Sequence, residues 1–324
     1  MQKRYPLDQS PLFRLRSPEK LANLLEVSLM HLEVVANSEL QNYICFEKSI
    51  EREGRPPKIR YIQTPKQQLR QLQRRLANLL NRIEPPSYIH SGFRGRSYST
   101  NAKSHGMGTR LAKIDIRSFF PSSSAVYVNK CFRNEFECSL DVAAVLTKLT
   151  TLSGHLPTGA GTSTILSYYA YKPMFGRIYS MAKSCGLTMS CCVDDMTFSG
   201  AAASAGFLNK VAVVVKSFGL KVHKRKCFEP HECKIVTGVA VTPQGYRLPN
   251  VRRKKLHEAY SDFENEVNLE RKEKLGERLL GRATEAAQIE EQFKKLVPLA
   301  SEKLRNTRTT IIQENIARAS RLHA

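Results

Sequence analysis

The stretch that decides the fold reads Ser190-Cys191-Cys192-Val193-Asp194-Asp195-Met196-Thr197-Phe198-Ser199-Gly200. Apolar residues lead into two adjacent aspartates and a β-type run leads out, a pattern that predicts a hairpin with Asp194 and Asp195 at its turn. Adjacent carboxylates repel each other, so a fold that points both inward needs a cation there. A divalent ion held by carboxylates and substrate phosphates meets that need, and the simpler alternative is an exposed acidic turn.

A second carboxylate site favours the metal-binding alternative. Residues 113–121 read Lys-Ile-Asp-Ile-Arg-Ser-Phe-Phe-Pro, and Asp115 stands between Ile114 and Ile116 in a pattern typical of a strand. A lone charge in such a run is costly unless it is paired or bound to a metal. One aspartate from a strand and two from a hairpin form the carboxylate set of a two-metal phosphoryl-transfer site.

Five short motifs follow the order found in the palm of reverse transcriptases, and their order and spacing resemble the bacterial, retron-type branch. In chain order they are Asn101-Ala102-Lys103-Ser104-His105, Asp115 with Phe119-Phe120-Pro121, Leu156-Pro157-Thr158-Gly159, Val193-Asp194-Asp195 and Val236-Thr237-Gly238. The first and the last resemble the Asn-Ala-x-x-His and Val-Thr-Gly elements of retron enzymes. The resemblance covers roughly residues 20 to 250.

The fold that this resemblance implies is a right-hand polymerase of the α+β class. We expect an N-terminal helical extension at 1–50, fingers at 51–110, a palm at 111–248 with an antiparallel sheet backed by helices, and a helical thumb at 249–324. Local patterns agree with parts of this division. Ser17 and Pro18 predict a helix start, residues 43–65 alternate as two strands with a turn, leucines between 66 and 83 recur at helical spacing, and charged helical sequence fills 250–324.

The resemblance also implies a chemistry, which is RNA-templated DNA synthesis with two Mg²⁺ ions, for which Mn²⁺ is a substitute. The predicted catalytic and metal-binding residues are Asp115, Ile116, Asp194 and Asp195. The predicted nucleotide-binding residues are Arg60, Phe120, Thr158, Gly159 and Lys226, with Phe120 as the aromatic gate against a ribose 2′-hydroxyl and Lys226 as a proton donor to pyrophosphate. Arg60 as an exposed strand arginine, Phe119 or Phe120 as core, and Lys226 in a solvated basic turn are the alternatives.

Two positions depart from the pattern of the family. The family reads Leu-Pro-Gln-Gly where this chain has Thr158 in place of the glutamine, and Tyr-Ala-Asp-Asp where it has Cys192 and Val193. Thr158 is too short to span the same gap to a template or incoming base. The loss of the tyrosine removes an aromatic ring near the primer end, while both carboxylates of the pair remain.

The charge of the chain points to a polyanionic partner. The formal net charge is +22, and residues 52–110 contain 13 Lys and Arg against 2 Asp and Glu, which is half of the excess. A solvated face mixes both signs, so this region is predicted to track a phosphate backbone, although a surface loop is the alternative for 88–101. The predicted RNA-binding residues are Arg70, Arg74, Arg94, Arg96, Asn101, His105, Val236, Thr237 and Gly238. Local capping and packing is the alternative for Asn101 and His105.

By family analogy the expected partners are a structured non-coding RNA that serves as template and primer, its RNA-linked DNA product, deoxynucleotides and an effector protein in antiphage defence. The eight cysteines lack paired C-x-x-C spacing, no apolar run approaches a membrane span and no signal-peptide core follows Met1, so we expect a cytoplasmic protein with reduced thiols. Two alternatives remain open: another defence-associated or group II-intron-like reverse transcriptase, and a catalytically silent RNA-binding scaffold.

Overall fold

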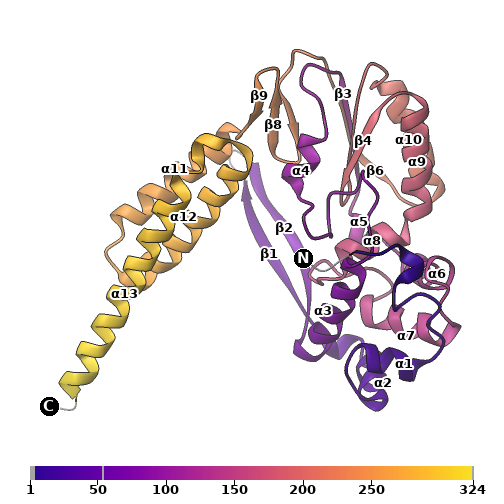
Figure 1. Cartoon of the computed structure of the whole chain (residues 1–324), viewed down its shortest axis with the longest axis horizontal. Coiled ribbons are helices and arrows are strands. Elements are labelled where there is room, and N and C mark those ends of the chain that lie inside the picture. Colours follow the sequence, from indigo (N-terminus) through magenta and orange to yellow (C-terminus); the bar gives the residue numbers. More distant parts are fainter. Residues whose placement is uncertain (1–3, 53–54, 323–324) are drawn as a thin grey trace. The chain divides into compact units, whose positions relative to one another are not determined.

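The computed structural model describes residues 4–52 and 55–322, and these residues form two compact units. The first unit comprises residues 1–97 and 110–228, and the second comprises residues 98–109 and 229–324. Residues 98–109, from the predicted fingers, and 229–248, from the predicted palm, are grouped with the C-terminal helices. The helices and strands of both units are labelled in Figure 1.

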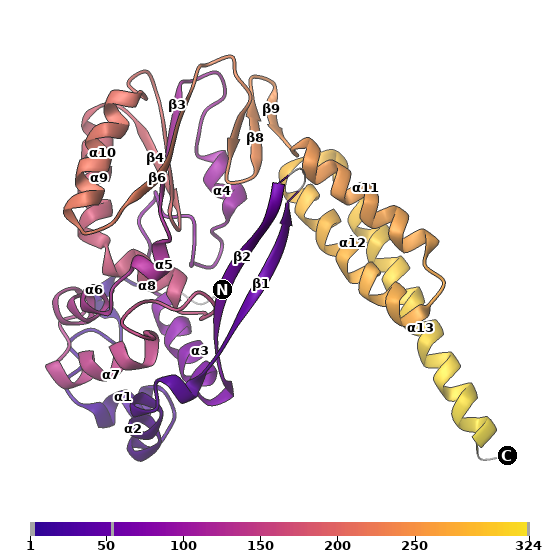
Figure 2. The same cartoon turned by 180° about the vertical axis from the view of Figure 1, so that it is seen from behind.

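The first unit contains a four-stranded antiparallel sheet in the order β4-β5-β3-β6. Its strands are β3 (Leu111–Ile116), β4 (Thr188–Cys192), β5 (Asp195–Ser199) and β6 (Val222–Phe228). Helices α9 (Lys172–Ser184) and α10 (Ala205–Ser217) cover one face of this sheet (Figures 1 and 2). Ile114, Met196 and Phe198 point to that covered face and are almost fully buried. The alternate side chains, Asp115 and Asp195 among them, therefore point to the opposite face.

A separate ribbon of two long strands carries the alternating sequence of the predicted fingers hairpin. It consists of β1 (Tyr43–Arg52) and β2 (Arg55–Pro65), paired antiparallel from Tyr43↔Pro65 onward. Helix α3 (Gln67–Asn81) follows directly and buries the leucines whose spacing predicted it. The hairpin and the helix confirm the expected elements in this region.

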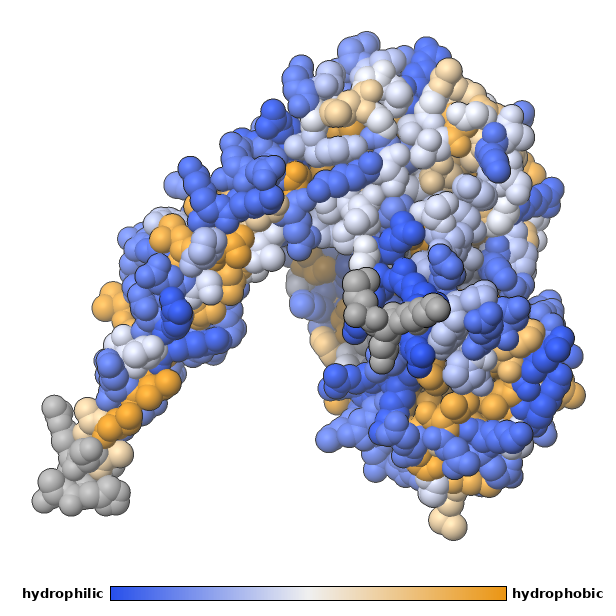
Figure 3. Space-filling view, in the orientation of Figure 1, coloured by the Kyte–Doolittle hydropathy of each residue, from blue (hydrophilic) through white to orange (hydrophobic). Residues whose placement is uncertain are grey.

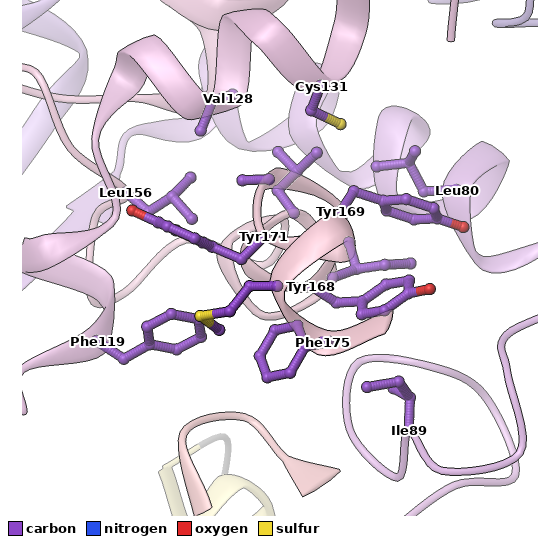
Figure 4. Packing of buried hydrophobic residues seen from close by; sticks show 14 of the residues in the cluster. Leu80, Ile89, Phe119, Val128, Cys131, Leu156, Tyr168, Tyr169, Tyr171 and Phe175 are labelled. Atoms are coloured by element: carbon purple, nitrogen blue, oxygen red, sulfur yellow. The ribbon is translucent and has the colours of Figure 1, made fainter. Parts of the chain in front are cut away.

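The remaining elements of the first unit pack around an aromatic core. They are η1 (Leu7–Gln9), α1 (Pro18–Leu24), α2 (Leu29–Asn37), η2 (Leu40–Asn42), α5 (Phe119–Ser122), α6 (Ala125–Lys130), the single π-turn η3 (Cys131–Glu135), α7 (Leu140–Thr150) and α8 (Ser163–Ala170). Ser17 caps α1 as expected, accepting a hydrogen bond from the Lys20 amide at 3.3 Å. Tyr168, Tyr169 and Phe175 lie at the centre of the core, whose side chains come from several helices (Figure 4).

One expected element of this unit is divided. The sequence predicts a helix from Ser163 to Met181, with Pro173 as the candidate position of a kink, whereas the structure has α8 and α9 separated at Tyr171. Pro173 occupies the first turn of α9, where a missing amide hydrogen costs nothing, instead of kinking a continuous helix.

The second unit joins a small sheet to three long helices. It contains α4 (Tyr98–Lys103), strands β7 (Lys234–Val236), β8 (Val239–Thr242) and β9 (Gly245–Arg247), helices α11 (Asn250–Asn265) and α12 (Leu269–Ile289), η4 (Glu291–Phe293) and α13 (Leu296–Leu322). Residues 235–241, which the sequence predicts to contain a strand and a turn, form β7 and β8 with Thr237 and Gly238 between them. Figure 3 shows apolar surface toward the end of α13, where Ile312 and Ile316 are about 60% exposed. None of the helices described is long and apolar enough to span a bilayer.

Candidate active site

The three aspartates meet on the open face of the four-stranded sheet. Asp115 of β3 and Asp195 of β5 are direct partners in the antiparallel register. Asp194 precedes Asp195 in the turn that joins β4 to β5. The alternation of β3 and β5, with apolar residues toward the helices, brings the two strand carboxylates together. The site is therefore built from two strands that are about 80 residues apart in sequence.

The turn itself differs from the expected one. Cys192 and Asp195 are the last paired residues of the hairpin, so the two turn residues are Val193 and Asp194 rather than the two aspartates. Val193 has a φ of 61°, in the left-handed region. Two-residue hairpins need a positive φ at the first turn position, which sequence reasoning assigns to Gly, Asn or Asp and not to valine.

Burial and the neighbouring carboxylates raise the pKa values of Asp194 and Asp195. Burial, and then the charge of Asp115, raises the pKa of Asp194 to about 6. Burial also raises the pKa of Asp195, against the opposing effect of the Lys113 ammonium. The neighbouring thiols are affected in the same way, since burial raises the pKa of Cys192 to about 11 and keeps that thiol protonated. The arrangement thus favours an additional positive charge near Asp194.

Two cationic or basic side chains already lie against the carboxylates. The Lys113 ammonium is 3.0 Å from Oδ2 of Asp195, and Nδ1 of His223 is 3.1 Å from Oδ2 of Asp115. Lys113 lies two residues before Asp115 on the same face of β3, and His223 follows the register shift between β3 and β6. Sequence reasoning missed both roles. The period of two along 113–115 is the signal that identifies Lys113, whereas the His223 contact depends on the β-bulge and has no local signal.

The donor set suits a hard divalent cation, but the side chains are not gathered around one. Within residues 4–52 and 55–322, no three His, Cys, Asp or Glu side chains are placed to hold a metal ion. Oδ1 of Asp195 is buried and makes no hydrogen bond to the described residues, which leaves one carboxylate oxygen available as a ligand. Carboxylate oxygens are the ligands that Mg²⁺ prefers. Ile116 has a buried side chain, and its amide donates to the Asp194 carbonyl at 3.1 Å, so only its own carbonyl can serve as a ligand.

Thr158 and Gly159 dock the β1-β2 ribbon against the core of the first unit. The Thr158 hydroxyl donates to the Tyr61 carbonyl at 2.8 Å and accepts from the Gln63 amide at 3.2 Å. The Gly159 amide donates to the Gln63 carbonyl, and a Cβ at Gly159 would lie 2.7 Å from that oxygen. A short hydroxyl at 158 and a glycine at 159 therefore fit the backbone of β2, a contact that the sequence did not reveal.

The other three predicted nucleotide-binding residues lie on three different elements of the first unit. Lys226 of β6 pairs in register with Lys113, which lies two residues before Asp115 on β3. The Lys226 ammonium is 4.5 Å from the centre of the Phe228 ring. Phe120 lies in the short helix α5, half-buried, whereas Phe119 is the core residue of the pair. Arg60 is exposed on β2 opposite Lys48.

The predicted RNA-binding arginines lie on two elements of the first unit. Arg70 and Arg74 are exposed on α3, where Arg70 also donates twice to the Pro65 carbonyl. Arg94 and Arg96 lie in the loop before α4, and Arg96 donates to the Ser87 carbonyl at 3.3 Å. Arg94 is exposed and Arg96 is partly buried.

The two retron-type elements meet inside the second unit. Asn101, His105 and Val236 have no exposed surface. The Asn101 amide group donates to the Thr237 hydroxyl at 3.3 Å, and that hydroxyl donates to the Tyr98 carbonyl at 2.8 Å. As they stand, these buried residues support the fold of their unit and do not form a surface for RNA.

Thr237 and Gly238 form the turn between β7 and β8. Their φ values are 45° and 86°, which are those of a type I′ hairpin turn. The Arg252 guanidinium packs directly on Gly238, where a Cβ would overlap it. Arg252 also pairs with Glu285 and lies 5.1 Å from the centre of the Tyr98 ring. A glycine is therefore required at position 238, both for the backbone conformation of the turn and for the packing of the Arg252 guanidinium against it.

Comparison with known proteins agrees with these observations. No family model matches the chain. A retron Se72 reverse transcriptase of Salmonella heidelberg is 30% identical over 56% of this chain and 48% of its own length. A retron Mx162 reverse transcriptase of Myxococcus xanthus is 28% identical over 60% of the chain and 46% of its own length, and the retron Ec86 reverse transcriptase of Escherichia coli is 26% identical over 68% and 71%.

An antiparallel sheet with paired aspartates on its open face places the chain among α+β proteins with a carboxylate-centred site. The chain is homologous to several retron reverse transcriptases, which agrees with the resemblance that its motifs showed. The chain spans about half the length of the first two of these relatives.

Proposed function

We propose that the protein is an RNA-directed DNA polymerase of a retron. In this proposal it copies part of a structured non-coding RNA into single-stranded DNA that stays linked to the RNA. The observation that carries the proposal is the register pairing of Asp115 with Asp195, with Asp194 beside them in the turn, in a chain homologous to reverse transcriptases. The expected division into fingers, palm and thumb, and the role in antiphage defence with an effector protein, belong to the same proposal.

Asp115, Asp194 and Asp195, with the Ile116 carbonyl, would hold two Mg²⁺ ions, or Mn²⁺ in their place. Such ions activate an attacking hydroxyl and stabilise the charge that develops on phosphate. The chain itself contributes positioning. Arg60 is proposed to bind the incoming nucleotide, Phe120 to exclude a 2′-hydroxyl, and the Lys226 ammonium to donate a proton to the leaving pyrophosphate. Thr158 and Gly159 contribute by fixing the ribbon that carries Arg60.

The basic surface is proposed to bind the RNA backbone. Arg70, Arg74, Arg94 and Arg96 are the exposed or partly exposed arginines of a region with a strong positive excess. Asn101, His105, Val236, Thr237 and Gly238 are proposed to act on RNA recognition through the fold of the second unit, because their side chains are buried or engaged. The reaction consumes deoxynucleotides, and we place it in the cytoplasm.

The decisive experiment is to purify the protein from its native host with its bound nucleic acid. The sample is treated separately with RNase and DNase and compared with an Asp194→Asn/Asp195→Asn variant on a denaturing gel. A DNA of fixed length that is attached to RNA and missing from the variant supports the proposal. RNA alone, identical in both samples, supports the second candidate, an RNA-binding scaffold favoured by the net charge of +22. DNA without an RNA link supports a reverse transcriptase of another type.

A further inference from the structure

The turn between β4 and β5 places an unfavourable residue at its first position. The turn residue before Asp194 is Val193, a β-branched residue with a φ of 61°. In this region the Cβ of an L-residue crowds its own backbone, and a branched side chain increases the crowding. Such a conformation persists only where the surrounding structure holds it, and it is most often held at functional sites.

The surrounding structure that holds this turn is the segment Tyr88–Ser91. The Tyr88 carbonyl accepts a hydrogen bond from the Cys191 amide at 2.7 Å, and the His90 amide donates to the Cys191 carbonyl at 2.8 Å. Ile89 and Cys191 thus form a short parallel bridge beside β4. The segment therefore extends the edge of the sheet as far as the turn.

The last contact of this segment is made by a side chain. The Ser91 hydroxyl accepts a hydrogen bond from the Val193 amide at 2.8 Å. On the other side of the turn, the Asp194 carbonyl accepts from the Ile116 amide at 3.1 Å. The peptide groups of both turn residues are fixed from outside the hairpin, one by Ser91 and one by the strand that carries Asp115.

We propose that Ser91 is a positioning residue of the proposed active site, whose hydroxyl holds the Val193 peptide in the left-handed conformation that aims Asp194. The inference rests on the proposed function for its effect on catalysis. Ser91 belongs to the basic loop 88–101, which the charge pattern predicts to bind RNA, so the inference assigns this residue a different role. When the hydroxyl is removed, Val193 is free to relax to a negative φ, and the carboxylate that follows it turns away from Asp115 and Asp195.

The test uses substitutions at both partners. Ser91→Ala removes the acceptor, Ser91→Thr keeps it, and Val193→Gly removes the crowding because glycine adopts a positive φ freely. We expect Ser91→Ala to lower kcat by about 10- to 100-fold, the range for a misplaced reacting group, with the KM for deoxynucleotides and the affinity for RNA unchanged. Ser91→Thr should retain kcat, and adding Val193→Gly to Ser91→Ala should restore kcat to the level of Val193→Gly alone.

A readout without catalysis keeps the inference separate from the proposed function. Hydrogen exchange at the Val193 amide should accelerate in Ser91→Ala and not in the control Ser184→Ala, which removes an exposed hydroxyl at the end of α9. Unchanged exchange at Val193, or a Ser91→Ala defect that Val193→Gly does not relieve, overturns the inference. A protein that makes no DNA but shows the faster exchange overturns only the proposed function. A loss of RNA affinity at unchanged kcat assigns Ser91 to RNA binding instead.

Discussion

Replacing Gly238 with alanine should destabilise the second unit by more than the backbone conformation alone explains. Gly238 has a φ of 86°, where an alanine costs about 1–2 kcal/mol. The new Cβ would also overlap the Arg252 guanidinium, so the Arg252 side chain must move away from the turn. Arg252 pairs with Glu285, with both side chains about 30% exposed, and lies over the Tyr98 ring.

Displacing Arg252 adds a second cost to that of the backbone. A partly buried ion pair together with a cation–π contact contributes about 1–2 kcal/mol. The expected total for Gly238→Ala is therefore about 2–4 kcal/mol. Gly108→Ala is the matched control, because Gly108 belongs to the same unit, has a φ of 70° and has open space around its Cβ position. It should cost only the backbone part, about 1–2 kcal/mol.

The assay is native-state hydrogen exchange at the amides of β7 and β8, since the chain has two units and a single unfolding transition is not assured. Arg252→Ala is the second substitution of a double-mutant cycle with Gly238→Ala. In that background the cost of Gly238→Ala should fall to the cost of Gly108→Ala. Equal costs for the two glycine substitutions in the wild-type background, or a cycle without coupling, would refute the reasoning.

Three further outcomes are expected. Thr158→Val keeps the shape but removes both hydrogen bonds to β2, so exchange at the Gln63 amide should accelerate by about 5-fold, as for a loss of about 1 kcal/mol. Asp194→Asn should stabilise the metal-free protein by about 1–3 kcal/mol at pH 8, because folding raises the pKa of the Asp194 carboxyl to about 6 and so disfavours its ionised form. In urea titrations this gain in the free energy of unfolding should shrink as the pH falls through 6 and vanish below about pH 4. Lys113→Met removes the cation beside Asp195, so luminescence titration should show tighter Tb³⁺ binding; unchanged binding contradicts a competing role for Lys113.

Local patterns were sufficient where one residue type controls the backbone. The isoleucines beside Asp115 placed it in a strand, the leucines of 67–81 specified a helix face, and Ser17 specified a helix start. The register of Asp115 with Asp195 follows from these alternations once the two strands are adjacent. The close approach of the Asp115 and Asp195 carboxylates could therefore be predicted from the sequence.

The errors occur where tertiary contacts override local preference. Valine is a poor candidate for a left-handed turn residue, so the turn was expected one position later. For the basic run of β6 the sequence left two alternatives, a nucleotide-binding segment and a solvated turn, because charges on both faces of an edge strand hide the alternation. The grouping of 98–109 with 229–324 depends on contacts that no local pattern encodes.

The state of the three carboxylates follows from the cations around them. Two of the aspartates have a basic side chain within 3.1 Å, and the pKa of Asp194 is raised to about 6 by burial and by Asp115. The Lys113 ammonium thus offsets only part of the repulsion between the carboxylates. A divalent ion that bound Oδ2 of Asp195 would compete with the Lys113 ammonium for that oxygen. Because a divalent ion adds positive charge beside the carboxylates, metal binding should lower the pKa of Asp194 and draw its side chain toward Asp115.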